Sequence, residues 1–277
     1  FCMPKINDHN QPPVNHPTEH PVRVATWNIH KGVNGLGPRR RLEIHNIGLA
    51  IDQFDADIVC LQEVWLMKDL RYLREKLAKT GLTESFFAGG AVKNRKGLAI
   101  FSKIPIKSGE YHIFDGRSIS FRDFIDKIRK GESSWPNGFS SISVEIDGKT
   151  FAVINAHLTF FDRSSDKNRE KSVTKGEIRQ LFDYINPLRL GVAGVFICGD
   201  FNMDVKDEDM LLPNGLKIVS DVSELTLTGE ANPYANAKDR MTCDLIIGPE
   251  SVNIIKKEII KKPLVSDHYV VSSEIEI

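Results

Sequence analysis

A chain of 277 residues and 31.2 kDa fits one large domain, since single α/β domains commonly reach about 250 residues. Its 41% hydrophobic and 27% charged residues are typical of a globular protein and exclude collagen-like, coiled-coil and largely disordered chains. Lys and Arg total 37, as do Asp and Glu, so the net charge is zero and no overall positive field attracts nucleic acid. Any phosphate binding is therefore expected to be local.

Residues 1–21 hold five of the 13 prolines and three of the eight histidines and lack a periodic apolar pattern. They are predicted to form a flexible N-terminal segment in front of a folded domain at residues 22–277. The chain begins with Phe1 and Cys2 rather than Met, as a processed chain does. This start leaves an exported or lipid-anchored protein and a cytoplasmic protein as alternatives.

The rest of the chain predicts more strands than helices. The first strand covers residues 22–29 and precedes a glycine-rich loop, after which Ile44, Ile47 and Ile51 recur at helical spacing. The further elements are a strand at 57–62, a helix at 66–77, strands at 97–102, 106–114, 139–146 and 150–157, a helix around 178–185, and strands at 195–198, 243–247, 252–260 and 269–277. This order favours an α/β (α+β) protein with mixed sheets packed between helices over a barrel of repeating strand–helix units.

Polar side chains interrupt these apolar strands at or just past their ends. They are Asn28, Glu63, Asn155, His157, Asp200, Asn202, Asp244, Asp267 and His268. Each alone has a structural explanation, such as a turn residue or a helix cap. Together they offer oxygen ligands, imidazoles and amides at strand ends, where the sites of α/β proteins assemble. This combination predicts a Mg²⁺-dependent site for phosphodiester hydrolysis.

Six segments that contain these residues resemble, in order, the motifs of the endonuclease/exonuclease/phosphatase superfamily. They are Thr26-Trp27-Asn28-Ile29, Leu61-Gln62-Glu63-Val64, Asn155-Ala156-His157-Leu158, Gly199-Asp200-Phe201-Asn202, Cys243-Asp244-Leu245-Ile246 and Ser266-Asp267-His268-Tyr269. The family includes deoxyribonucleases, apurinic endonucleases, neutral sphingomyelinases and inositol-polyphosphate 5-phosphatases. The resemblance implies that residues 22–277 form a catalytic domain, a four-layer αββα sandwich of two mixed β-sheets flanked by helices.

The resemblance also implies a metal site. Glu63 would be the principal Mg²⁺ ligand, Asn28 would assist, and Asp267 would contribute from the other side, directly or through water. Mn²⁺ is the expected substitute for Mg²⁺. Because Mg²⁺ keeps several of its waters, such a sparse protein shell is chemically sensible. We expect a monomer that needs no obligate protein partner.

The catalytic roles follow from the same resemblance. Asp200 would orient or deprotonate the attacking water, and Asn202 would hold this water or a phosphate oxygen. His268 would face the phosphate with its ring fixed by Asp244, and His157 would stabilise or protonate the leaving oxygen. We assign His157 as the acid and His268 as the base.

The substrate is predicted less directly than the reaction. A basic cluster at residues 163–175 follows the His157 motif, and Asn155, Arg163 and Lys167 are predicted to contact the substrate. A nuclease would use such cations as phosphate anchors. We therefore expect a nuclease-like phosphodiesterase acting on nucleic acid.

Two alternatives stay open. Apolar residues between 115 and 137, with Trp135 and the pair Phe160 and Phe161, suit a segment that seats in a bilayer interface beside the site. The substrate would then be a sphingolipid or a phosphoinositide. An inactive binding module on the same fold ranks below both, because every predicted site residue is present.

Overall fold

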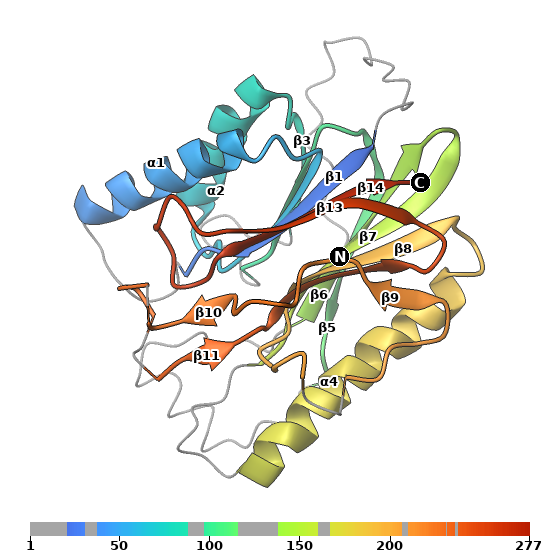
Figure 1. Ribbon diagram of the computed structural model, residues 1–277. Helices are drawn as coiled ribbons and strands as arrows, with labels where there is room; N and C mark the ends of the chain where they lie inside the picture. The colour runs from blue at the N-terminus through green and yellow to red at the C-terminus, as the bar shows by residue number, and fades with distance from the viewer. Residues whose placement is uncertain are drawn as a thin grey trace.

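Two six-stranded β-sheets lie face to face with helices on their outer sides (Figure 1). The computed structural model describes residues 21–30, 38–87, 97–115, 138–159, 167–206, 210–230, 232–235 and 238–277, with the backbone alone at 38–43 and 167–172. In Figure 1, α1 and α2 lie on one side of the sheets and α4 on the other. The predicted four-layer αββα architecture is confirmed.

The first sheet has the strand order β13-β14-β1-β2-β4-β3. Its strands are β1 (Val22–Asn28), β2 (Ile58–Gln62), β3 (Glu84–Phe87), β4 (Ala99–Ser102), β13 (Asn253–Ile260) and β14 (Val270–Glu276). The helices on its outer face are α1 (Pro38–Gln53) and α2 (Met67–Leu77), the latter followed by the 3₁₀ turn η1 (Ala78–Thr80). Strands β1 and β2 are parallel, whereas the other pairs are antiparallel.

The second sheet has the order β5-β6-β7-β8-β12-β9. Its strands are β5 (Ile106–Ile113), β6 (Gly138–Ile146), β7 (Lys149–His157), β8 (Gly194–Asp200), β9 (Leu216–Ile218) and β12 (Asp244–Pro249). Only β7 and β8 are parallel among these described strands, and α4 (Lys167–Leu188) covers the outer face. A small separate ribbon pairs β10 (Leu227–Thr228) with β11 (Arg240–Met241).

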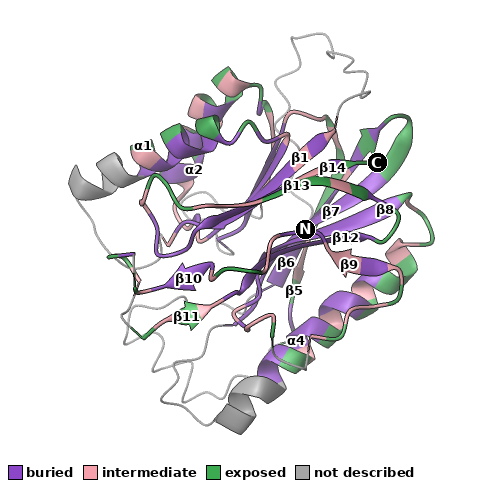
Figure 2. Ribbon diagram, in the orientation of Figure 1, coloured by how far each residue is buried: buried purple, intermediate pink, exposed green. Residues whose placement is uncertain are grey.

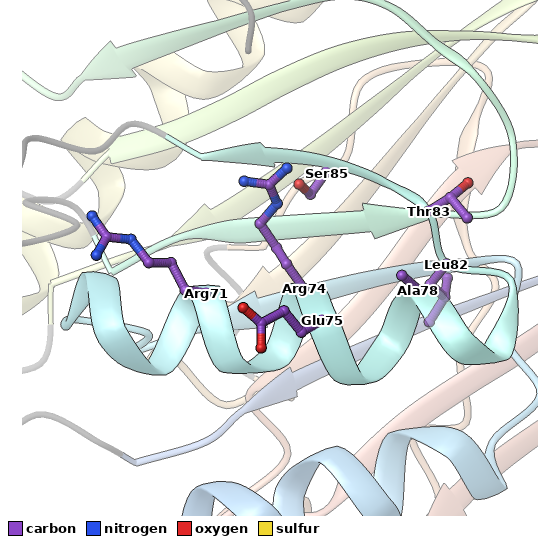
Figure 3. A pocket seen from close by; sticks show the side chains of 7 residues that line it. All are labelled: Arg71, Arg74, Glu75, Ala78, Leu82, Thr83 and Ser85. Atoms are coloured by element: carbon purple, nitrogen blue, oxygen red, sulfur yellow. The ribbon is translucent and has the colours of Figure 1, made fainter. Parts of the chain in front are cut away.

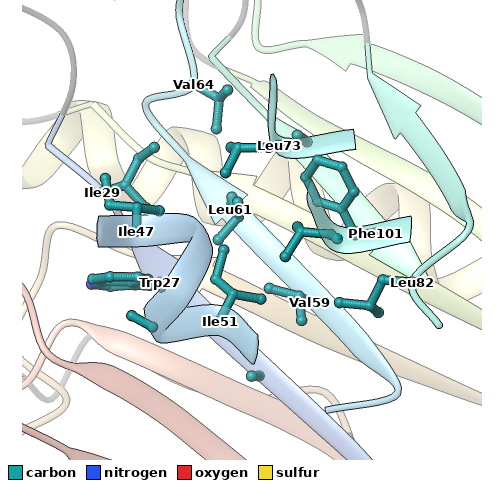
Figure 4. Packing of buried hydrophobic residues seen from close by; sticks show 14 of the residues in the cluster. Trp27, Ile29, Ile47, Ile51, Val59, Leu61, Val64, Leu73, Leu82 and Phe101 are labelled. Carbon is teal, nitrogen blue, oxygen red and sulfur yellow. The ribbon is translucent and has the colours of Figure 1, made fainter. Parts of the chain in front are cut away.

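Side-chain alternation along the strands builds three apolar layers. In β2, Ile58 and Cys60 point between the sheets, whereas Val59 and Leu61 point toward α1 and α2, because successive strand residues face opposite sides. Figure 4 shows this outer layer, with Trp27 and Leu61 packed beside α1. The central strands, such as β2, β4, β8 and β12, are buried on both faces and purple in Figure 2, whereas the edge strands β5 and β13 are largely exposed. The sheets are therefore rigid supports for the loops at their edges.

Most predicted elements are confirmed, with small shifts at their ends. Helix α4 is longer than the apolar pattern around 178–185 indicated, and the short strands β3, β9, β10 and β11 were not predicted. Except for Pro21, the predicted flexible segment 1–21 lies outside the described residues, as does almost all of 115–137. Among the helices that the structure describes, none has the length and apolarity needed to cross a membrane.

Candidate active site

The first sheet brings four predicted site residues to one edge. Strands β1 and β2 pair in parallel with Asn28 opposite Gln62, so both chains leave the sheet at this edge and Glu63 follows at once. Asp267 and His268 directly precede β14, which runs antiparallel to β1. The carboxyl ends of β1 and β2 and the start of β14 therefore meet.

The second sheet brings its own group to the same place. His157 and Asp200 end the parallel strands β7 and β8 opposite each other, and Asp244 begins β12 opposite Asp200. At Gly199 a Cβ atom would lie 1.9 Å from the Ala156 carbonyl oxygen, and φ is +150°, so only glycine allows this close approach. The glycine in the Gly-Asp-Phe-Asn motif thus lets β8 carry Asp200 into the site.

Asp200 joins the two sheets and lies at the centre of the site. Its Oδ2 accepts a hydrogen bond from Asn28 Nδ2 of the other sheet at 2.9 Å, and its Oδ1 accepts one from the Asn202 backbone N–H at 2.8 Å. The Nε2 atoms of His157 and His268 lie 3.7 and 3.8 Å from Oδ2. A buried carboxylate between two imidazoles is well placed to accept a proton from a water molecule.

The ring of His268 is fixed from several sides. Its Nδ1 lies 2.8 Å from Asp244 Oδ2, and the indole N–H of Trp27 donates to its backbone carbonyl at 3.0 Å. Burial lowers the pKa of His268, but the carboxylates of Asp244, Asp267 and Asp200 outweigh this effect and raise its pKa well above the usual value. These three carboxylates therefore favour the charged, imidazolium form of His268.

The metal-binding group predicted from the sequence lies beside these residues. Asn28 Nδ2 is 3.3 Å from Glu63 Oε1, and the Ser266 hydroxyl lies 2.7 Å from the Asn28 carbonyl oxygen and 3.2 Å from Asp267 Oδ1. Burial disfavours the charged form of Asp267, but His268 and a hydrogen bond from His30 keep its pKa below the usual value. The carboxylates of Glu63 and Asp267, each linked to Asn28 by these contacts, are a donor set that suits a hard divalent cation such as Mg²⁺ or Mn²⁺.

The orientation of Asn28 differs from the predicted role. Its Oδ1 accepts the backbone N–H of His30 at 3.0 Å, while its Nδ2 faces the carboxylates of Glu63 and Asp200. Held in this way, Asn28 orients the two carboxylates as a donor. If the side-chain oxygen Oδ1 of Asn28 were to bind a cation, the side-chain amide would have to rotate by about half a turn.

A second group of side chains is close enough to hold a cation by distance alone. It consists of Asp200, Cys243 and His268. Burial, together with the charges of Asp244 and Asp200, raises the pKa of the Cys243 thiol well above the usual value. A protonated thiol is a poor ligand, since the thiolate is the form that binds metals. The chemistry of the donors therefore favours Glu63 and Asp267.

His30 belongs to the site, although the sequence analysis did not single it out. Its Nδ1 lies 2.9 Å from Asp267 Oδ2. It also has a left-handed backbone with φ of +43°, as do Glu63 at +64° and Asn202 at +49°. Only five described non-glycine residues have such a backbone, and three of them follow the strands whose ends form the site. A signal was present, because His30 is also a polar residue just past a strand end.

Asn155 has a different position from the one expected. It is fully buried, and its Nδ2 donates to the carbonyl oxygens of Leu61 and Ala99 at 2.9 and 3.1 Å. Its Oδ1 accepts a hydrogen bond from Gln62 Nε2 at 2.7 Å. The structure thus gives Asn155 no access to a substrate. It joins the two sheets, because it lies two residues before His157 on β7 and bonds Gln62, the residue before Glu63, on β2.

We expect Asn155→Leu to destabilise the fold by about 2–4 kcal/mol, because the Leu61 and Ala99 carbonyls and the Gln62 amide would each lose a buried hydrogen bond. Urea unfolding of wild type and variant measures this difference. Asn253→Leu is a suitable control, since Asn253 Nδ2 bonds Glu276 at an exposed position. Equal midpoints for wild type and Asn155→Leu would show that the inter-sheet bonds contribute nothing.

The remaining predicted residues are placed only in part. Asn202 donates its Nδ2 to the Leu158 carbonyl at 2.8 Å, which ties the end of β8 to the segment after His157. Arg163 lies outside the described residues, and of Lys167 the structure describes only the backbone at the start of α4. Their predicted contacts with substrate stay predictions.

Two cavities lie outside this cluster in the part of the chain that the structure describes. One, of about 290 Å³, lies between α2 and the start of β3, where Figure 3 shows Arg74 directed toward Ser85. The other, of about 400 Å³, lies beside β10 and β11 and is lined in part by Lys206 and Tyr269. Neither of these two cavities includes a predicted catalytic or metal-binding residue.

Comparison with known proteins agrees with this geometry. The model of the Endonuclease/Exonuclease/phosphatase family matches residues 25–268. Sphingomyelin phosphodiesterase 2 of Homo sapiens is 27% identical over 191 residues, which are 67% of this chain and 42% of that protein. The putative neutral sphingomyelinase of Drosophila melanogaster is 25% identical over 190 residues, 67% of this chain and 40% of that protein. The chain thus spans less than half the length of these curated relatives.

Solved structures share the fold at lower identity. The crystal structure of D. rerio TDP2 complexed with single strand DNA product has a TM-score of 0.70 and 15% identity and covers 93% of this chain and 99% of that one. Sphingomyelinase C from Streptomyces griseocarneus has a TM-score of 0.69 and 17% identity and covers 92% and 99%. With the family model matched from the first strand to His268, the chain belongs to the endonuclease/exonuclease/phosphatase family.

Proposed function

We propose that this protein hydrolyses a phosphodiester by attack of water, with a divalent cation at Glu63 and Asp267. The observation that carries the proposal is the position of Asp200, which lies within 4 Å of two imidazoles and is hydrogen-bonded to Asn28, the neighbour of Glu63. Such an arrangement provides a base, proton donors and a cation site around one point, as hydrolysis of a charged ester requires.

In this mechanism Asp200 accepts a proton from the attacking water. Its carboxylate is held by the Asn202 N–H and the Asn28 amide, so the carboxylate already has a fixed orientation when the water molecule binds. The new bond joins the water oxygen to phosphorus, and the bond from phosphorus to the leaving oxygen breaks. The products are a phosphomonoester and an alcohol.

The two histidines donate hydrogen bonds or protons to the ester. His157 protonates the leaving oxygen, as expected, but the raised pKa of His268 favours a donor to a phosphate oxygen over the base assigned from the sequence. A cation beside Asp267 would weaken the contribution of Asp267 to the raised pKa of His268. Asp244 would remain in contact with the imidazole ring. We therefore assign the base role to Asp200.

A bound Mg²⁺ supplies positive charge that offsets the growing negative charge on the phosphate. We expect EDTA to abolish hydrolysis and Mg²⁺ or Mn²⁺ to restore it. Glu63→Gln should need a higher Mg²⁺ concentration for its half-maximal rate, because a charged oxygen ligand becomes neutral. Glu145→Gln, which changes an exposed carboxylate paired with Lys107, is the matched control. Full activity in EDTA would contradict the metal requirement.

For the substrate we propose a phosphosphingolipid, which was the alternative in the sequence analysis. The support comes from the curated relatives, which are sphingomyelin phosphodiesterases and related proteins. The zero net charge also gives no general attraction to nucleic acid. The likeness to TDP2 concerns the fold alone, at 15% identity, and does not favour DNA.

A panel of substrates tests the reaction and the substrate class together. We expect Mg²⁺-dependent release of phosphocholine from sphingomyelin vesicles, together with slow cleavage of bis-p-nitrophenyl phosphate. Cleavage of plasmid or single-stranded DNA without phosphocholine release would overturn the lipid substrate and retain the reaction. No hydrolysis of any member of the panel would overturn the reaction and favour an inactive binding module.

A further inference from the structure

His30 contacts the carboxylate of Asp267 through its imidazole ring. Each carboxylate oxygen of Asp267 has a neighbouring donor, since Nδ1 of His30 lies 2.9 Å from Oδ2 and the Ser266 hydroxyl lies 3.2 Å from Oδ1. The hydroxyl has one proton to donate and lies closer, at 2.7 Å, to the backbone carbonyl oxygen of Asn28. His30 is therefore the principal side-chain donor among these contacts.

The backbone at His30 supports a functional origin for this contact. A left-handed backbone costs a non-glycine residue about 1–3 kcal/mol and persists where surrounding interactions compensate. At His30 the compensation is visible, because its N–H donates to Asn28 Oδ1 and its ring donates to Asp267. His30 thus connects Asn28 with Asp267, two residues of the predicted cation site. The imidazole side chain keeps 36% of its surface exposed, so it is partly accessible to solvent.

We propose that His30 is a positioning residue that fixes the Asp267 carboxylate for the divalent cation. The inference rests on the proposed function, because it takes Asp267 as a cation ligand. A donor to a ligating carboxylate restricts its rotation, so the ligand oxygen is already aimed when the cation arrives. Nδ1–H can donate from neutral or protonated imidazole, so the role does not depend on the charge of His30.

Two substitutions suit the left-handed backbone and so keep the turn. His30→Gly removes the imidazole, whereas His30→Asn keeps a short N–H donor, and both residues adopt positive φ readily. Mn²⁺ binding to the purified proteins, without substrate, is measured by isothermal titration calorimetry. We expect His30→Gly to weaken Mn²⁺ binding by about 10- to 100-fold, the usual loss when a partner of a metal ligand is removed. His30→Asn should recover part of the affinity.

His45→Ala is the matched control, because it removes an exposed histidine whose Nδ1 bonds the Tyr72 hydroxyl and which contacts no site carboxylate. Its Mn²⁺ affinity should equal that of wild type. In assays of hydrolysis, His30→Gly should raise the Mg²⁺ concentration for the half-maximal rate far more than it lowers kcat at saturating Mg²⁺. Thermal unfolding of each variant confirms that it is folded.

Wild-type Mn²⁺ affinity in His30→Gly, alongside lost affinity in Glu63→Gln, would overturn the positioning role. So would a loss of kcat that saturating Mg²⁺ does not recover, because His30 would then act on the substrate. Failure of the proposed function is separate, since it would show as intact Mn²⁺ binding in wild type with no hydrolysis of any phosphodiester.

Discussion

Asp200→Asn should lower kcat for phosphodiester hydrolysis by about 10²–10⁴-fold, the usual contribution of a general base. Asparagine has the same shape, and its single oxygen can keep the bond from the Asn202 N–H, while its NH₂ group replaces the oxygen that accepts from Asn28 Nδ2. What is lost is this second bond, the negative charge between His157 and His268, and the capacity to accept a proton from water. Steady-state hydrolysis of bis-p-nitrophenyl phosphate at saturating Mg²⁺ measures the loss.

Asp221→Asn is the control for this substitution. Asp221 Oδ1 accepts the Ser223 backbone N–H at 2.8 Å, which is the contact that Asp200 makes with Asn202, but Asp221 lies away from the site residues. It should retain wild-type activity. If Asp200→Asn also keeps most of the wild-type rate, the base must be another group.

Asp244→Asn should give a second large loss, of about 10²–10⁴-fold in kcat, through His268. The Asp244 carboxylate accepts the Nδ1 hydrogen bond at 2.8 Å and is one of the three acids that raise the pKa of His268. A neutral amide would lower that pKa. The ring would then lose its proton at a lower pH than in the wild type, and with it much of its attraction for the phosphate.

The pH profile of kcat distinguishes a lowered pKa of His268 from a change in the position of its ring. Because the folded pKa of His268 is raised, the active imidazolium is present at low pH and is lost as the pH rises through that pKa. The alkaline limb of kcat should therefore move to lower pH in Asp244→Asn. An unchanged limb with normal kcat would show that the contact between Asp244 and His268 does not assist the reaction.

Local patterns in the sequence predicted mixed sheets packed between helices and the polar residues at strand ends, whereas the four-layer order and the roles of the site residues came from the family resemblance. The alternation in β2, with Cys60 directed between the sheets and Leu61 directed toward the helices, follows from the two-residue period of a strand. Glu63 follows β2 and Asp200 ends β8, so each could be predicted to lie at the end of a strand, where the sites of α/β proteins assemble.

Features that depend on distant partners could not be predicted. Asn155 on the second sheet bonds Gln62 on the first instead of facing the substrate, and no local pattern in the sequence shows which residues of two sheets meet. The hydrogen bond from His30 to Asn28 likewise decides which end of the Asn28 amide faces Glu63. The strands β10 and β11 have only two residues each, too few for a periodic pattern.

Crystals soaked in Mn²⁺ and measured at an energy where manganese scatters anomalously would test the whole arrangement most directly. We expect one anomalous peak in contact with the carboxylates of Glu63 and Asp267, close to Asn28. A peak between Asp200, Cys243 and His268, or none in a protein that needs the metal for activity, would contradict a cation site shared by the ends of β2 and the segment before β14.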